Sequence, residues 1–184
     1  MRFLYNLLTY LLFVPFAVYW LVRGVSNRVY FDRLYQRFGF GFPRIDGCIW
    51  IHAVSVGEVQ AAEPLIRALI ARFPDRQLLV TTVTPTGAAR VRALFGESAQ
   101  HCYIPFDVPS AVNNFARCVR PHTAPIMDPE LWPNPYRGCG IRDLPQIMDR
   151  ARISPKAVPG YAKLLPLIRE TLSYGFIIAA QSQD

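Results

Sequence analysis

Apolar and polar residues follow three different patterns along the chain. Residues 3–22 form an apolar stretch without a charged side chain, about long enough to cross the hydrocarbon core of a bilayer as a helix. Arginines and aromatic residues then alternate up to residue 46. From residue 47 onward, short β-rich apolar runs alternate with segments of helical periodicity. The pattern therefore predicts a helical region at 1–24, a basic-aromatic segment at 25–46 and a folded domain at 47–184.

The folded domain is predicted to be an α/β structure. Strands are expected at residues 48–54, 77–84 and 101–107, and helices at residues 59–73, 85–96 and 108–119. This β-α-β-α-β-α order predicts a Rossmann-like parallel sheet with helices on both faces. Thr84, Pro85 and Gly96 have the residue types that begin and end a helix at 85–96. Pro64 is expected to kink the preceding helix or to mark its true beginning.

The region from residue 122 to residue 149 fits the alternation poorly. A fourth strand is expected near residue 124, yet it contains Pro125, which would remove a ladder hydrogen bond from a central strand. Pro135, Gly138 and Gly140 stand where the next helix is expected. The sequence therefore leaves the fourth and fifth strands undecided.

The region 1–24 is predicted to be a membrane anchor helix that either spans the bilayer or lies in its interface. The arginines beyond it place the body of the protein on the cytoplasmic side. Segment 25–46 suits an anionic lipid surface, and it would equally suit packing of its aromatic stripe on the domain. Both interpretations stay open.

Charge and cysteine content narrow the choice of partner only slightly. The formal net charge of +7 favours an anionic partner, such as a lipid surface or a phosphorylated substrate. No segment resembles a nucleic-acid recognition motif. The four cysteines match no zinc spacing, and we interpret them as reduced, mostly buried thiols.

The stretch Ser55-Val56-Gly57-Glu58 follows the first predicted strand and precedes a helix. In doubly wound folds, ligands bind at the carboxyl ends of the strands. Gly57 would permit a tight turn there. Glu58 would suit the positive end of the helix dipole, or it would act as a base on a substrate. The pattern of residues alone leaves both roles possible.

Five motifs occur in an order that resembles one enzyme family. They are HAVSVGEVQAAEPLIRAL, TTVTPTGAARV, YIPFDVP, ELWPN and ARISPKAVPGYAKL. Together they resemble 3-deoxy-D-manno-octulosonic acid (Kdo) transferase. The resemblance implies one half of a GT-B glycosyltransferase, the acceptor-binding half, preceded by a membrane helix.

The resemblance also implies roles for individual residues. Glu58 would be the general base and Glu130 the stabiliser of the transition state, while Ser55, Gly57 and Asp128 would bind substrate. Trp132, Pro133 and Asn134 would shape the loop. Kdo would pass from CMP-Kdo, without metal or cofactor, to a lipid A precursor. The protein would be anchored at the cytoplasmic side of the inner membrane, in contact with anionic lipids.

The chain ends where the donor-binding half of such an enzyme would begin. We therefore expect little transferase activity from this polypeptide alone. Two other functions stay open: a non-catalytic, membrane-bound module that binds lipid A precursors, and an inactive gene remnant.

Overall fold

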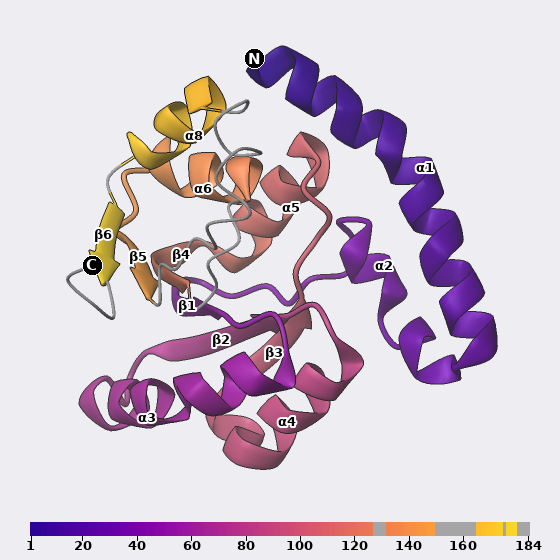
Figure 1. Cartoon of the computed structure of the whole chain (residues 1–184). Coiled ribbons are helices and arrows are strands. Elements are labelled where there is room, and N and C mark those ends of the chain that lie inside the picture. The colour runs from indigo at the N-terminus through magenta and orange to yellow at the C-terminus, as the bar shows by residue number, and fades with distance from the viewer. Residues whose placement is uncertain (127–131, 150–164, 175, 180–184) are drawn as a thin grey trace.

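The structure, a computed structural model, describes residues 1–126, 132–149, 165–174 and 176–179. Its centre is a six-stranded sheet in which every pair of neighbouring strands is parallel. The spatial order is β3-β2-β1-β4-β5-β6 (Figure 1). The strands are β1 Cys48–His52, β2 Gln77–Thr82, β3 Gln100–Tyr103, β4 Pro121–Ile126, β5 Gln146–Asp149 and β6 Phe176–Ala179. This is the strand order of a Rossmann fold, so the predicted fold class is confirmed.

Helices cover both faces of the sheet. Helices α3 and α4 lie on one face, and α5, α6 and α8 lie on the other (Figure 1). Their bounds are α3 Val56–Arg72, α4 Pro85–Phe95, α5 Pro109–Val119, α6 Pro133–Gly140 and α8 Leu165–Leu172. All five residues of β1 are buried, and the four apolar ones alternate between two apolar cores. Ile49 and Ile51 pack with α3 and α4, whereas Cys48 and Trp50 pack with α5 and α6.

The predicted helix boundaries hold for α4 and change for α3. Helix α4 begins at Thr84, whose hydroxyl accepts a hydrogen bond from the Gly87 N–H group (3.1 Å), and it ends at Gly96 with a positive φ of 52°. Helix α3 begins at Val56, three residues earlier than expected, and runs through Pro64. The helix tolerates this proline because the carbonyl that loses its partner belongs to Gln60, an exposed residue.

The fourth and fifth strands, which the sequence left undecided, both form. Strand β4 includes Pro125 and pairs with β1 on one side and β5 on the other, and β5 pairs in turn with β6. Helix α6 also forms, with Pro133 and Pro135 in its first turn, where backbone N–H groups have no partner inside the helix. Gly140 lets this helix approach Tyr174, because a Cβ atom there would lie only 2.3 Å from the Tyr174 side chain.

The amino-terminal helix α1 (Arg2–Ser26) lies along the body of the protein (Figure 1). Its less exposed positions recur every three or four residues and form one stripe that faces the domain. Phe13 packs against Phe38 and Phe106, and Trp20 packs against Tyr30. The opposite side is apolar and exposed, with exposed fractions of 83% for Phe3 and 79% for Val25. By length and composition, α1 alone among the described helices could cross a membrane.

Segment 25–46 packs on the domain. Instead of one amphipathic helix it forms two short ones, η1 Arg28–Phe31 and α2 Leu34–Arg37, followed by an extended stretch. Gln36 and Arg37 of α2 are buried, and so are Phe42 and Ile45. The structure therefore supports the second of the two interpretations of this segment, in which it contacts the domain.

Candidate active site

The order in which successive strands are added to the sheet reverses direction between β1 and β4. The chain extends the sheet from β1 through β2 to β3 and then returns to the other side of β1 with β4. At such a switch point the loops at the carboxyl ends of the two strands separate and leave a crevice. The Ser55–Glu58 stretch follows β1, and the segment with Asp128 and Glu130 follows β4 in sequence.

Glu58 forms part of the start of helix α3. Ser55 is the N-cap residue, and its backbone N–H donates to the Glu58 Oε2 atom (2.6 Å), which completes a capping box. The residue is half-buried. This contact orients the carboxylate at the carboxyl edge of β1 and engages one of its two oxygens. The Glu58 side chain therefore caps the start of α3, at the positive end of the helix dipole. Among the described residues, its second oxygen has no hydrogen-bond partner, so that oxygen is the one available for chemistry.

Gly57 does not make the tight turn that we expected. It lies inside the first turn of α3, and its φ is not positive. A Cβ atom at this position would meet only the Ser55 hydroxyl, 3.9 Å away. Because the residue has no side chain, the amino terminus of α3 stays uncovered, which suits close approach by a ligand.

The other two predicted acidic residues, Asp128 and Glu130, lie outside the described residues. The residues on either side of that segment are described. Ile126, the last residue of β4, is paired with His52, the last residue of β1. Trp132 packs its ring edge-on against the ring of His52, with the ring centroids 6.1 Å apart. The motif containing Trp132 and the motif containing Glu58 therefore share one edge of the sheet.

His52 is a residue of this edge to which the sequence gave no role. The side chain is buried, and its Nδ1 atom lies 2.9 Å from the Thr81 hydroxyl, which also accepts a hydrogen bond from the Trp50 ring N–H (2.8 Å). Burial lowers the pKa of His52 to about 4, so its imidazole is neutral at pH 7. Its Nε2 atom has no hydrogen-bond partner among the described residues. The sequence could have indicated a place for His52 at the site, because the residue comes just before the Ser55–Glu58 stretch.

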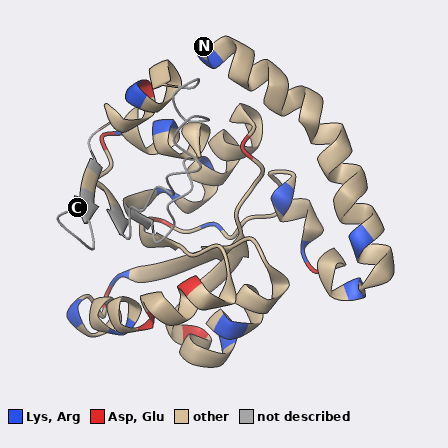
Figure 2. Cartoon of the chain, viewed as in Figure 1, with Lys and Arg blue, Asp and Glu red and all other residues tan. Residues whose placement is uncertain are grey.

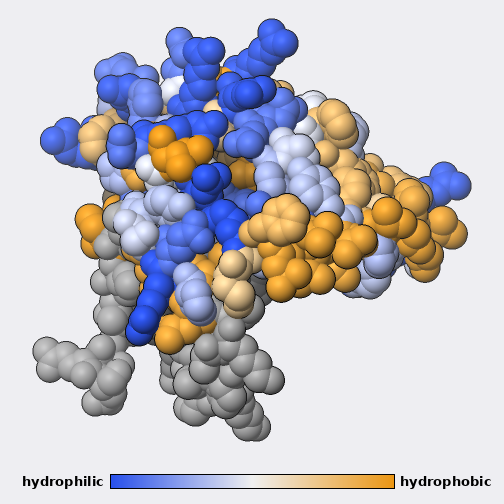
Figure 3. All heavy atoms as spheres, turned by 90° about the horizontal axis from the view of Figure 1, so that it is seen from above, coloured by the Kyte–Doolittle hydropathy of each residue, from blue (hydrophilic) through white to orange (hydrophobic). Residues whose placement is uncertain are grey.

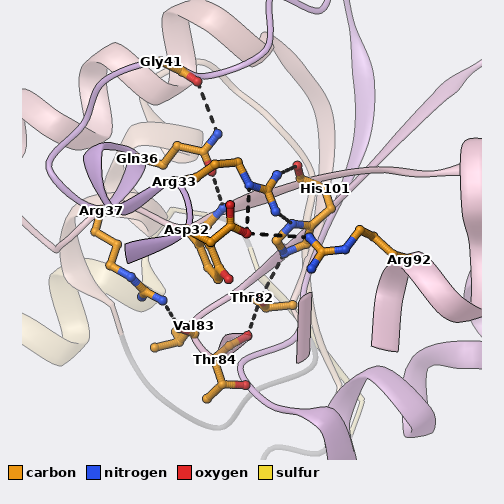
Figure 4. A network of polar contacts seen from close by, with 11 residues as sticks. Asp32, Arg33, Gln36, Arg37, Gly41, Thr82, Val83, Thr84, Arg92 and His101 are labelled. Carbon is orange, nitrogen blue, oxygen red and sulfur yellow. Dashed lines mark hydrogen bonds and ion pairs between the residues drawn. The ribbon is translucent and has the colours of Figure 1, made fainter. Parts of the chain in front are cut away.

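Basic residues collect around His101 of the edge strand β3 (Figure 4). Arg33 donates to the His101 carbonyl (2.8 Å), and its guanidinium shares the Asp32 carboxylate with Arg92, at 3.5 and 3.9 Å respectively. Burial and the nearby arginines lower the pKa of His101 to about 3. With one carboxylate between two guanidinium groups, the cluster carries net positive charge. Figure 2 shows that the ribbon carries basic positions at α2, at α4 and near the carboxyl end of α1.

Arg37 connects this cluster to helix α1. The guanidinium lies between the rings of Trp20 (3.8 Å to the ring centroid) and Tyr103 (4.3 Å), and it donates to the Val83 carbonyl (2.5 Å). Arg37 is 2% exposed, and burial lowers its pKa to about 10, so it stays charged. It therefore attaches the carboxyl-terminal half of α1 to the carboxyl end of β2 through cation–π contacts.

A cavity of about 420 Å³ lies at the other end of the strands, near their amino ends. Its lining includes Arg44 and Asp46, which precede β1, and Arg117 and Arg120, at the end of α5. Because it opens at the amino ends of the strands, it is separate from the switch point. Among the described residues there is no group of three or more His, Cys, Asp or Glu side chains that could hold a metal ion.

Comparison with known proteins shows which family has this arrangement. The family described as 3-deoxy-D-manno-octulosonic-acid transferase (Kdo transferase) matches residues 32–184. The chain belongs to the Kdo transferase family. The 3-deoxy-D-manno-octulosonic acid transferase of Haemophilus influenzae is 39% identical over 162 residues, which cover 86% of this chain and 38% of the relative. That of Bordetella pertussis is 32% identical over 141 residues, covering 74% of this chain and 32% of the relative.

A Kdo transferase from Rickettsia felis is 35% identical over 115 residues, which cover 62% of this chain and 25% of the relative. The chain thus spans well under half of the length of these Kdo transferases. The matched family covers the sheet and the helices on both of its faces, so the fold described here is that of the amino-terminal part of a Kdo transferase.

Proposed function

We propose that this chain is the acceptor-binding part of an enzyme that transfers Kdo from CMP-Kdo to a lipid A precursor in lipopolysaccharide biosynthesis. The observation that carries the proposal is the meeting of two motifs at the switch point, the Glu58 capping turn and the Trp132 turn, in a chain of the Kdo transferase family. Glu58 is the general base. Its free oxygen takes the proton of a sugar hydroxyl, which attacks the anomeric carbon of Kdo while CMP leaves with the electrons of the breaking bond.

Glu130 has the role of stabilising the transition state, and Asp128, Ser55 and Gly57 bind the acceptor. The uncovered amino terminus of α3 offers N–H donors to a polar group of the acceptor. The cluster of Arg33 and Arg92 supplies positive charge for its phosphates. Neither a metal ion nor another cofactor takes part in this proposal.

Helix α1 attaches the enzyme to the inner membrane, with the domain on the cytoplasmic side, and lies in the plane of one leaflet. Hydrophobic side chains gather on the side of the molecule formed by α1 (Figure 3). The opposite stripe of the helix contacts the rest of the protein from Arg2, which pairs with Glu170, to Trp20, which stacks on Arg37. A helix crossing the bilayer would leave these contacts, whereas one lying in the interface keeps them.

The experiment that tests the function is a transfer assay with radiolabelled CMP-Kdo. The chain is continued by the carboxy-terminal part of the Haemophilus influenzae relative, and Glu58→Gln is compared with Glu63→Gln on the same helix. We expect Glu58→Gln to lower the turnover by roughly 10²–10⁴-fold while acceptor binding is retained. Glu63→Gln should leave turnover unchanged. Equal turnover in the two variants would contradict the proposal and favour a non-catalytic binding module.

A further inference from the structure

Asp107 joins two distant elements to its own loop. The residue lies between β3 and α5, and its Oδ2 atom accepts a hydrogen bond from the Tyr5 hydroxyl of helix α1. Its Oδ1 atom accepts from the backbone N–H of Asn134 in α6 (3.1 Å), and its carbonyl oxygen accepts from the Asn134 side-chain amide (3.0 Å). Arg2 of α1 also donates to the Asn134 Oδ1 atom (3.5 Å). Helix α1 therefore contacts α6 both directly and through Asp107.

Asp107 provides the cap that helix α6 does not carry in its own sequence. The N-cap residue of α6 is Trp132, whose side chain makes no capping hydrogen bond. The next residue is Pro133, which has no N–H group, so Asn134 offers the first backbone donor. A carboxylate at this position satisfies that donor and suits the positive end of the helix. The start of α6, and with it Trp132, is thus fixed by a residue from another part of the chain.

The same carboxylate depends on α1 for a hydrogen-bond donor. Tyr5 is on the stripe of α1 that faces the domain, while its neighbours Phe3 and Leu4 are exposed and apolar. Burial raises the pKa of Asp107 to about 6, and the hydrogen bonds from Tyr5 and Asn134 oppose that rise. Moving the amino-terminal end of α1 away from the body would remove one of these two donors and weaken the hold on Asn134.

We propose that Asp107 is a positioning residue, which couples the seating of helix α1 on a lipid bilayer to the placement of the Trp132–Asn134 turn. The inference rests on the proposed function in one respect, namely that this turn lies at the edge of the sheet where Glu58 is proposed to act as the base. A bilayer contacts the outer face of α1, and its effect passes through the Tyr5 hydroxyl to the Asp107 carboxylate and on to Asn134. The turn next to His52 is then fully placed only when α1 is seated.

The test uses the three tryptophans of the full chain as reporters. The chain is labelled with 5-fluorotryptophan, placed in bicelles of phosphatidylethanolamine and phosphatidylglycerol and observed by ¹⁹F NMR, and the Trp132 resonance is assigned with a Trp132→Phe variant. Tyr5→Phe removes the hydroxyl that donates to Asp107. The matched control, Tyr10→Phe, removes a hydroxyl on the same helix that pairs with Ser110 (3.2 Å) and not with Asp107.

We expect Tyr5→Phe to displace the Trp132 resonance by more than its linewidth and Tyr10→Phe to leave it in place. Asp107→Ala should displace it as well. Asp107→Asn should restore it, because the amide oxygen accepts from Asn134 and the amide N–H donates to the Tyr5 hydroxyl. An unmoved resonance in Tyr5→Phe, or equal displacement in Tyr10→Phe, would overturn the proposal. If Asp107→Ala does not fold, the two tyrosine variants still decide the question.

A second arm replaces the bicelles with a neutral detergent, which presents no bilayer surface to α1. We expect the wild-type Trp132 resonance to move toward the position found for Tyr5→Phe and the Tyr5→Phe resonance to stay where it was. A wild-type resonance that does not respond to lipid would contradict the coupling. Neither arm requires Kdo transfer, so the failure of this proposal and the failure of the proposed enzymatic function give different results.

Discussion

The ring of Trp132 stands nearly perpendicular to the ring of His52, at an interplanar angle of 79°. His52 ends β1 and Trp132 begins the turn into α6, so the contact joins two segments 80 residues apart in sequence at one edge of the sheet. Glu58 lies just beyond His52, at the start of α3. The contact therefore places the motif that contains Trp132 beside the strand whose carboxyl end leads into the Ser55–Glu58 stretch.

The capping role and the catalytic role of Glu58 can be separated by the choice of substitution. Glu58→Gln keeps an oxygen that accepts from the Ser55 N–H group, so we expect its stability to stay within about 0.5 kcal/mol of wild type. Glu58→Ala loses that contact and should cost about 1 kcal/mol. Urea unfolding measures both. Glu63→Ala, which removes an i,i+4 ion pair with Arg67, is the control and should cost no more than about 0.5 kcal/mol. Equal stability of the Ala and Gln variants at Glu58 would mean that the capping contact contributes nothing.

Substitution of Arg37, a residue of α2 that stacks on Trp20 of helix α1, should strongly destabilise the fold. Arg37→Ala removes the stacking between Trp20 and Tyr103 and the hydrogen bond to the Val83 carbonyl, so we expect a loss of about 2–4 kcal/mol. Differential scanning calorimetry in detergent measures the loss, and limited proteolysis reports release of α1. Arg28→Ala, an exposed change in the same segment, should stay within about 0.5 kcal/mol. A similar loss in both variants would show that stacking of Arg37 between the two rings contributes no more to stability than an exposed arginine does.

Acid should destabilise the fold through the buried imidazole of His52. Its pKa of about 4 lies below the ordinary value of 6.5, so its contribution to stability is complete above pH 6.5 and is lost as pH falls toward 4. In that range of pH, the His52 imidazole binds a proton in the unfolded chain but stays neutral in the folded chain. The His52→Gln variant lacks this proton, and we expect its stability to fall less steeply with pH, by up to about 1.4 kcal/mol per pH unit. Urea unfolding at several pH values measures the difference. Parallel curves for the two proteins would contradict the prediction.

The outer face of α1 should determine binding to a bilayer. Leu11 and Val18 are 63% and 54% exposed, so charged residues there leave the packing on the domain intact. We expect Leu11→Glu or Val18→Glu to weaken partition into phosphatidylethanolamine–phosphatidylglycerol vesicles by roughly tenfold or more, because each variant replaces an apolar side chain that lipid would bury. Vesicle cosedimentation measures the partition. The control is Gln60→Glu, the same charge on an exposed position of α3, which should leave it unchanged. Partition that is insensitive to the α1 substitutions would exclude this face as the lipid contact.

The sequence by itself determined the order of the elements. Apolar runs and helical periodicity are local properties, so the strands at β1, β2 and β3, the cap at Thr84 and the helical character of residues 3–22 could all be predicted. The Ser55–Glu58 stretch was recognised as the approach to a helix for the same reason, since its residue types and spacing are local, although the helix already begins at Val56. The fourth and fifth strands were left undecided, and they form because pairing on both sides of β4 outweighs the hydrogen bond that Pro125 cannot make.

Only the tertiary structure decided which distant groups meet. No local pattern indicates that Asp107 caps a helix beginning at Pro133, that Arg37 stacks between Trp20 and Tyr103, or that His52 is adjacent to Trp132. Each of these contacts joins segments whose separation in the chain carries no information about their separation in space. They follow from the order in which the strands assemble, and that order is fixed by burial of both faces of the sheet rather than by any single residue.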